Sequence, residues 1–172
     1  SVRLEMAKKR LLGCDHVSLR TLSILAPAVE FQPEYDVVIS QRLLINLGSW
    51  WAQREALLNL MALVKPGGRL ILSEGSVDGA RELNSFRELM GLAPIPVPEH
   101  NVFIDDEALA IFFRFHGFKL ISAQGFGAYY LLTRGVQPAA TDSYHWSSKF
   151  NVDSIQAKVQ KMLPCADVFS RV

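Results

Sequence analysis

Two apolar segments on either side of a helical pattern constrain the fold more than any other feature of this sequence. Residues 35–40 (Tyr-Asp-Val-Val-Ile-Ser) and 69–73 (Arg-Leu-Ile-Leu-Ser) are almost continuously apolar, which predicts strands that are covered on both faces. Ser49 is a suitable cap for a helix that runs to about Val64, and the Lys-Pro-Gly-Gly turn at 65–68 ends this helix. The alternation predicts an α/β sheet with helices on both faces.

The remaining periodicity predicts further elements on both sides of this unit. Apolar spacing and capping residues predict helices over 2–12, 79–91 and 105–116, and a strand over 17–25. Two more strands, 118–124 and 128–134, are separated only by Gly-Phe-Gly, which predicts an antiparallel hairpin. Beyond residue 135 the pattern weakens, apart from a predicted helix near 152–163.

Composition and charge exclude several classes of protein. The chain has 172 residues, of which 49% are hydrophobic and 20% charged, as in one ordinary globular domain. The net charge of +1 disfavours a nucleic-acid partner. No apolar run is long enough to span a membrane, and no signal peptide is visible, so we expect a cytoplasmic protein without a membrane partner. Cys14 and Cys165 form neither a disulfide framework nor a metal pattern.

The strand at 35–40, taken together with the segment 63–75 (LVKPGGRLILSEG), resembles the class I S-adenosylmethionine-dependent methyltransferases. The segments 117–124 (GFKLISAQ) and 128–134 (AYYLLTR) look like the last two strands of that family. The resemblance implies a Rossmann-like sheet that ends in an antiparallel hairpin. It also implies that residues 1–134 form the C-terminal major part of a methyltransferase domain. Residues 135–172 match no part of the family, and we expect them to form a partly helical C-terminal extension.

The glycine-rich turn that opens the family's cofactor site has no counterpart in this chain. In the family's strand order, the strands at 17–25 and 35–40 are the third and fourth, so the first two strands are absent. In that order the two absent strands lie between the third and the fourth, so their absence leaves a gap of roughly 14 Å between the two strands that are present. We therefore expect the chain to be a fragment, and expect an upstream segment or a partner chain to complete the sheet.

The resemblance implies S-adenosyl-L-methionine as cofactor and four residues that contact it. Ser23 and Ile24 stand where the family has an acidic residue and a small apolar residue beside the adenine. Ser40 and Gln41 follow the strand whose end faces the methionyl part. For Ser23, ordinary polarity at a strand end is an equally open interpretation.

Three further residues follow the same strand ends and are candidates for binding the methyl acceptor. Arg42 suits an anionic acceptor, and Asn46 lies one helical turn away from it. Glu74 ends the strand at 69–73, where a carboxylate could attract a cationic acceptor or take a proton. The alternatives are structural: a salt bridge of Glu74 with Arg42 or Arg69, and a turn or capping role for Asn46.

A proline-rich insertion and the final strand supply the remaining candidates. Glu99, His100 and Asn101 lie in the insertion, which in the family usually covers the acceptor. His100 is the candidate catalytic base because its pKa normally lies near neutrality, although a loop histidine without a role is the open alternative. Asn101 and Tyr129 complete the predicted acceptor site. No spacing typical of a metal site is present.

The sequence therefore predicts methyl transfer from S-adenosylmethionine to a small-molecule acceptor. The alternative is a non-catalytic methyltransferase-like module that assists or completes a partner protein, and the missing glycine-rich turn and Ser23 favour it. A nicotinamide-dependent enzyme of related fold also needs a glycine-rich first turn, so the sequence does not favour this class.

Overall fold

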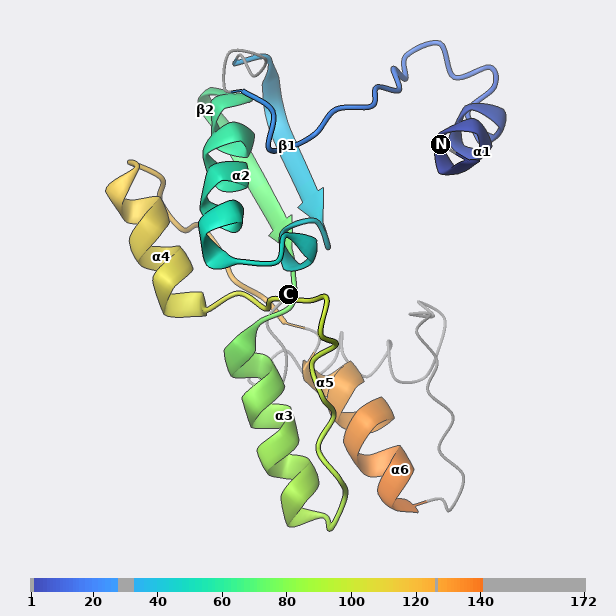
Figure 1. Cartoon of the computed structure of the whole chain (residues 1–172), viewed down its shortest axis with the longest axis vertical. Helices are drawn as coiled ribbons and strands as arrows, with labels where there is room; N and C mark the ends of the chain where they lie inside the picture. Colours follow the sequence, from blue (N-terminus) through green and yellow to red (C-terminus); the bar gives the residue numbers. More distant parts are fainter. Residues whose placement is uncertain (1, 28–32, 126, 141–172) are drawn as a thin grey trace.

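The computed structural model describes residues 2–27, 33–125 and 127–140 of the chain. Within these residues the protein is mixed α/β, with several helices and a small two-stranded parallel sheet (Figure 1). The elements, in chain order, are α1 (Val2–Arg10), β1 (Tyr35–Gln41), the 3-10 turn η2 (Leu44–Asn46), α2 (Trp50–Ala62), β2 (Val64–Ser73), α3 (Val77–Leu89), α4 (Asp106–Phe115), α5 (Gly127–Tyr130), the π-helical turn η3 (Leu131–Val136) and α6 (Gln137–Ala140).

The predicted strand–helix–strand unit is confirmed. β1 and β2 pair in parallel, with Val38 opposite Leu70 and Ile39 opposite Ile71. Ser49 caps α2 by accepting a hydrogen bond from the Ala52 amide at 3.2 Å. The apolar side of α2 packs on one face of the sheet. The buried core consists of Val38, Leu44, Ala56, Leu57, Leu60, Val64, Ile104 and Phe112.

The Lys-Pro-Gly-Gly segment is part of β2 rather than a turn before it, so the predicted strand start at residue 69 is wrong. The register slips between Tyr35 and Val37, which places residues 65–68 in an irregular stretch of the strand. Gly67 has a φ of +80°, which favours glycine. At Gly68 an added Cβ would lie 2.8 Å from the carbonyl oxygen of Asp36, so only glycine allows the two backbones to approach this closely.

The face of the sheet opposite α2 is uncovered in the described part of the chain. Val37, Ile39 and Ile71 are 49%, 68% and 48% exposed. Parallel strands this apolar are normally covered on both faces. The prediction of helices on both faces is therefore wrong for the described residues, and an apolar surface is left where the second layer was expected.

Two predicted strands form no β-ladder, and the predicted C-terminal hairpin is wrong. Residues 17–25 and 118–124 form no strand, and 127–140 are helical throughout α5, η3 and α6. A short apolar run fits either a strand or a buried helix, so its periodicity does not separate the two. In this segment the backbone N–H and C=O groups form helical hydrogen bonds with one another. The Thr133 hydroxyl also donates to the Tyr129 carbonyl at 2.7 Å.

The other predicted helices cover nearly the residue ranges that were expected for them. In space, α1 is set apart from the sheet (Figure 1). The predicted domain boundary after residue 134 falls inside η3 and stays a prediction. The predicted helix at 152–163 lies outside the described residues. Among the helices of the described ranges, none has both the length and the apolar composition that crossing a membrane requires.

Candidate functional site

The candidate site lies at the edge of the sheet where β1 and β2 both end. The register pairs Ser40 with Leu72 and Gln41 with Ser73, so the residues that follow each strand meet at one edge. Open α/β sheets bind ligands outside the carboxyl ends of their strands. Of the predicted site residues, this edge brings together Ser40, Gln41, Arg42, Asn46 and Glu74.

Glu74 is the buried centre of this edge, with only 6% of its surface exposed. One carboxylate oxygen accepts hydrogen bonds from the Ser40 hydroxyl at 3.2 Å and from the amides of Leu43 at 3.0 Å and Leu44 at 3.2 Å. The other oxygen accepts from the Ile45 amide at 3.3 Å. The charge is therefore stabilised by the protein's own donors, mainly by the backbone of the loop that follows β1.

These contacts give Glu74 a structural role at the site. Within the described residues it forms no ion pair with Arg42 or Arg69, so neither predicted salt bridge is present. Its oxygens face the chain's own amides, not an open cleft. Glu74 thus shapes the loop between β1 and α2, and the arrangement does not support its predicted role as an acceptor-binding group.

Arg42 has the strained backbone of the site. It is the one described residue other than glycine with a positive φ, at +50°. Its amide donates to the Ser73 carbonyl at 2.8 Å, and its carbonyl accepts from the Asn46 side chain at 2.6 Å. Non-glycine residues in this conformation cost about 1–2 kcal/mol and cluster at functional sites. Asn46 therefore has the turn-stabilising role that was its structural alternative. The Arg42 side chain is exposed.

A proline-rich strap, defined here as residues 92–104, connects α3 to α4 and reaches the same edge. At its start, the side chain of Asn84 and the backbone of Ile95 exchange two hydrogen bonds of 3.0 and 2.8 Å. At its end, the Val102 amide donates to the Ile45 carbonyl at 2.8 Å. The strap is therefore anchored to α3 on one side and to η2 on the other.

His100 and Asn101 occupy a turn near the end of the strap. The Asn101 amide donates to the Pro98 carbonyl at 2.8 Å. His100 is exposed and makes no hydrogen bond or ion pair with the described residues, so its predicted role as a base stays a prediction. The Asn101 side-chain oxygen is buried without a hydrogen-bond partner in the described chain. Because Val102 pairs with Ile45, Asn101 lies beside η2.

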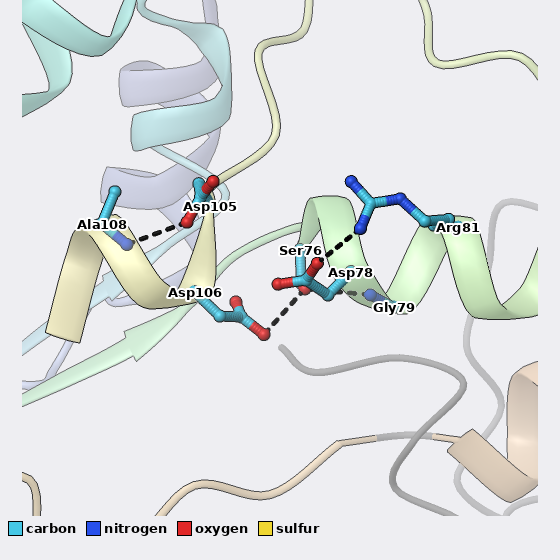
Figure 2. A network of polar contacts seen from close by, with 7 residues as sticks. All are labelled: Ser76, Asp78, Gly79, Arg81, Asp105, Asp106 and Ala108. Carbon is cyan, nitrogen blue, oxygen red and sulfur yellow. Dashed lines mark hydrogen bonds and ion pairs between the residues drawn. The ribbon is translucent and has the colours of Figure 1, made fainter.

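A polar network holds the end of the strap against the start of α3 (Figure 2). The Ser76 hydroxyl accepts from the Gly79 amide at 3.1 Å and donates to an Asp106 carboxylate oxygen at 3.0 Å. Backbone hydrogen bonds of 2.8 Å join Ile104 to both Gly75 and Val77. The N-termini of α3 and α4 are thereby tied together next to Glu74. Asp105 caps α4 as predicted, whereas the sequence pattern did not indicate the Ser76 cap.

Ser23 and Ile24 lie away from this edge. The side chain of Asn59, near the end of α2, donates to the Ile24 carbonyl at 2.7 Å. The end of α2 is next to the start of β1, because the Leu63 carbonyl accepts from the Tyr35 amide. The Ser23 hydroxyl accepts from the Leu25 amide at 3.3 Å, which is a local turn contact. The described residues therefore do not assemble the predicted cofactor set of Ser23, Ile24, Ser40 and Gln41.

Tyr129 lies on the helical segment 127–140, not on a strand of the sheet. It is 7% exposed and stacks edge-on against Tyr130, with ring centroids 5.7 Å apart. The segment packs along α3, where an added Cβ at Gly135 would lie 3.0 Å from the ring of Phe86. These contacts place Tyr129 in helix packing, so its predicted contact with an acceptor stays a prediction.

Neither a metal centre nor an enclosed cavity marks the site. Among the residues that the structure describes, no three or more His, Cys, Asp or Glu side chains are grouped to hold a metal ion. An open hollow of about 400 Å³ lies between α3 and the strap, away from the strand ends. The hollow is lined by Arg81, Asn84, Ser85, Glu88, Leu92 and Pro94.

Sequence reasoning missed Gln53, which lies in the first turns of α2 and is 1% exposed. Its side chain donates to the carbonyls of Leu44 and Val102, which belong to η2 and the strap. A polar residue on the apolar side of the predicted helix was the available signal.

Comparisons of the chain with protein-family models, with curated proteins and with solved structures found no match.

Proposed function

We propose that this protein takes part in S-adenosylmethionine-dependent methyl transfer to a small-molecule acceptor, on a partial Rossmann-like sheet. The observation that carries the proposal is the exposed Arg42, held in a strained conformation where two parallel strands end. The resemblance of residues 35–40 and 63–75 to class I methyltransferases supplies the reaction class.

Arg42 binds an anionic group of the acceptor in this proposal. A guanidinium group presents a planar set of donors that matches a carboxylate or a phosphate. Within the described residues, none of the ion pairs involves Arg42. Glu74 orders the loop that follows Arg42, so the backbone next to Arg42 is held without a ligand. Asn101 borders the same loop through its neighbour Val102.

The described residues do not by themselves fit S-adenosylmethionine. Ser40 is buried against Glu74, and Ser23 and Ile24 lie at the far end of α2. The cofactor site of the proposal therefore needs residues outside the described ranges, from an adjoining segment or from a partner chain. The uncovered sheet face formed by Val37, Ile39 and Ile71 offers such a segment an apolar surface.

Calorimetric titration of the purified protein with S-adenosylhomocysteine tests this proposal. Saturable binding with one site per chain is the expected result, because the product analogue shares the cofactor's adenosyl and homocysteinyl parts. In a methyl-transfer assay, Arg42→Ala raises the KM for the acceptor and leaves the affinity for S-adenosylhomocysteine unchanged. Failure of the protein to bind S-adenosylhomocysteine at millimolar concentration overturns the proposal.

A second function, that of a non-catalytic module that assists a partner protein, is favoured by one observation. Within the described residues, one apolar face of the sheet is uncovered, and the predicted cofactor residues are split between the two ends of α2. A module that completes its sheet on a partner needs this face but needs no cofactor. Co-purification with a partner, together with the absence of S-adenosylhomocysteine binding, would select this function.

A further inference from the structure

Gln53 is the most completely buried polar side chain among the described residues, with 1% of its surface exposed. Burying an amide costs free energy unless hydrogen bonds replace those lost to water. Gln53 meets this requirement with its side-chain nitrogen. This nitrogen donates to the Leu44 carbonyl at 3.1 Å and to the Val102 carbonyl at 2.7 Å.

The two acceptors of Gln53 belong to different parts of the candidate site. Leu44 lies in η2, directly after Arg42 and Leu43, whereas Val102 lies in the strap, directly after His100 and Asn101. The two segments are far apart in the sequence, and one amide group joins them. The Val102 amide adds a second link by donating to the Ile45 carbonyl at 2.8 Å.

These links set where the strap lies relative to η2. Three prolines, at 94, 96 and 98, remove backbone donors from the middle of the strap. Its position therefore depends on its anchors. These are Asn84 and Arg87 on α3 at the start, Gln53 with Ile45 near Asn101, and the backbone hydrogen bonds of Ile104 at the end. Loss of the Gln53 anchor would leave the strap near Asn101 with one backbone hydrogen bond to η2.

We infer that Gln53 is a positioning residue, whose amide group couples the loop bearing Arg42 to the strap bearing His100 and Asn101 so that the two move as one unit. The inference rests on the proposed function only where ligand binding is measured. The coupling itself is a property of the described hydrogen bonds.

Asn59 provides a matched control on the same helix. Its side chain is also buried, and its nitrogen donates to two backbone carbonyls, those of Ile24 at 2.7 Å and Ala26 at 3.1 Å. Six residues of helix separate it from Gln53, which corresponds to about 9 Å along the axis. Gln53→Met and Asn59→Leu each remove an amide that has two carbonyl partners, but only Gln53→Met does so at the candidate site.

Amide hydrogen exchange of the two variants is the first test. Gln53→Met should accelerate exchange of the Val102 amide about 10-fold relative to the amides between β1 and β2, since a lost buried hydrogen bond costs about 1.4 kcal/mol. Asn59→Leu should leave this ratio unchanged within about 2-fold. Equal ratios in the two variants would overturn the inference.

Ligand binding is the second test, with S-adenosylhomocysteine as the probe. Gln53→Met should weaken its binding about 10-fold, because the loop that Gln53 holds directly follows Gln41, which the resemblance places beside the methionyl part of the cofactor. Asn59→Leu should not change it. If the wild-type protein does not bind the probe, the proposed function fails, and the exchange ratio alone decides the inference about Gln53.

A third measurement needs no variant and applies even if Gln53→Met does not fold. In the wild-type protein, the amides of Leu44, Ile45 and Val102 should exchange with one common opening free energy, because their segments are coupled. A Val102 amide that opens separately from those of Leu44 and Ile45 would overturn the inference.

Discussion

The carboxylate of Glu74, just beyond β2, accepts a hydrogen bond of 3.2 Å from the hydroxyl group of Ser40 in β1. Through this contact the buried charge joins the ends of two parallel strands and, through three amides, orders the loop that follows β1. The exposed Arg42 lies at the start of this loop. The buried carboxylate of Glu74 thus orders the loop that carries Arg42, the residue proposed to bind the ligand.

Glu74→Gln should lower the free energy of unfolding by about 1–3 kcal/mol. The amide that replaces one oxygen points a donor at backbone amides, which are themselves donors. Urea unfolding measures the change, with the exposed Glu82→Gln as control, for which a change within about 0.5 kcal/mol is expected. A Glu74→Gln protein as stable as the control would refute the structural role.

Arg42→Gly should make the protein more stable by about 0.5–1 kcal/mol. Glycine relieves a strain of about 1–2 kcal/mol at the φ of +50°, and it loses about 0.5–1 kcal/mol to the greater freedom of the unfolded chain. Arg42→Ala keeps the strain and loses the charge, so its stability should match the wild type. Thermal unfolding of the three proteins separates the backbone effect from the charge. A less stable Arg42→Gly protein would argue against backbone strain at this position.

Asn84→Ala should free the start of the strap, because both hydrogen bonds between Asn84 and Ile95 are lost. We expect a loss of about 1–2 kcal/mol in the unfolding free energy and faster proteolytic cleavage within residues 92–101. The exposed neighbour Ser85→Ala is the control. Cleavage at the same rate in both variants would contradict the anchoring role of Asn84.

Ile39→Thr should change the unfolding free energy of the chain by less than about 0.5 kcal/mol, because Ile39 is 68% exposed. The neighbouring Val38→Thr places a hydroxyl in the core, where it should cost about 1–3 kcal/mol. Urea unfolding compares the two. If Ile39→Thr lowered the unfolding free energy as much as Val38→Thr, the sheet face that bears Ile39 would be covered in the purified protein.

The sequence predicted the strand–helix–strand unit because each of its signals is local. The apolar runs at 35–40 and 69–73 and the Ser49 cap act on their own neighbourhoods. The strand at 17–25 and the hairpin at 118–134 depended on non-local pairing. A strand needs a neighbouring strand, and the apolar run from Ala128 onward forms helical hydrogen bonds instead.

The candidate site was predictable in its location but not in its internal contacts. Residues after parallel strands meet at one edge by geometry, so Ser40, Arg42 and Glu74 were identified together. The role of Glu74 depends on which donors surround it, and those are backbone amides that no side-chain pattern reveals. Gln53 was missed for a similar reason, since both of its partners are backbone carbonyls.

The measurement that tests the account most directly is an amide NMR titration of the isotope-labelled protein with S-adenosylhomocysteine. Saturable shifts should be concentrated at residues 40–46, which include the strand end that the resemblance places beside the methionyl part of the cofactor, and at residues 99–104, the strap end that Gln53 joins to this loop. The amides of the helical segment 127–140 should not shift. An absence of shifts at millimolar ligand, or shifts confined to residues outside the loop and the strap, would contradict the proposed site.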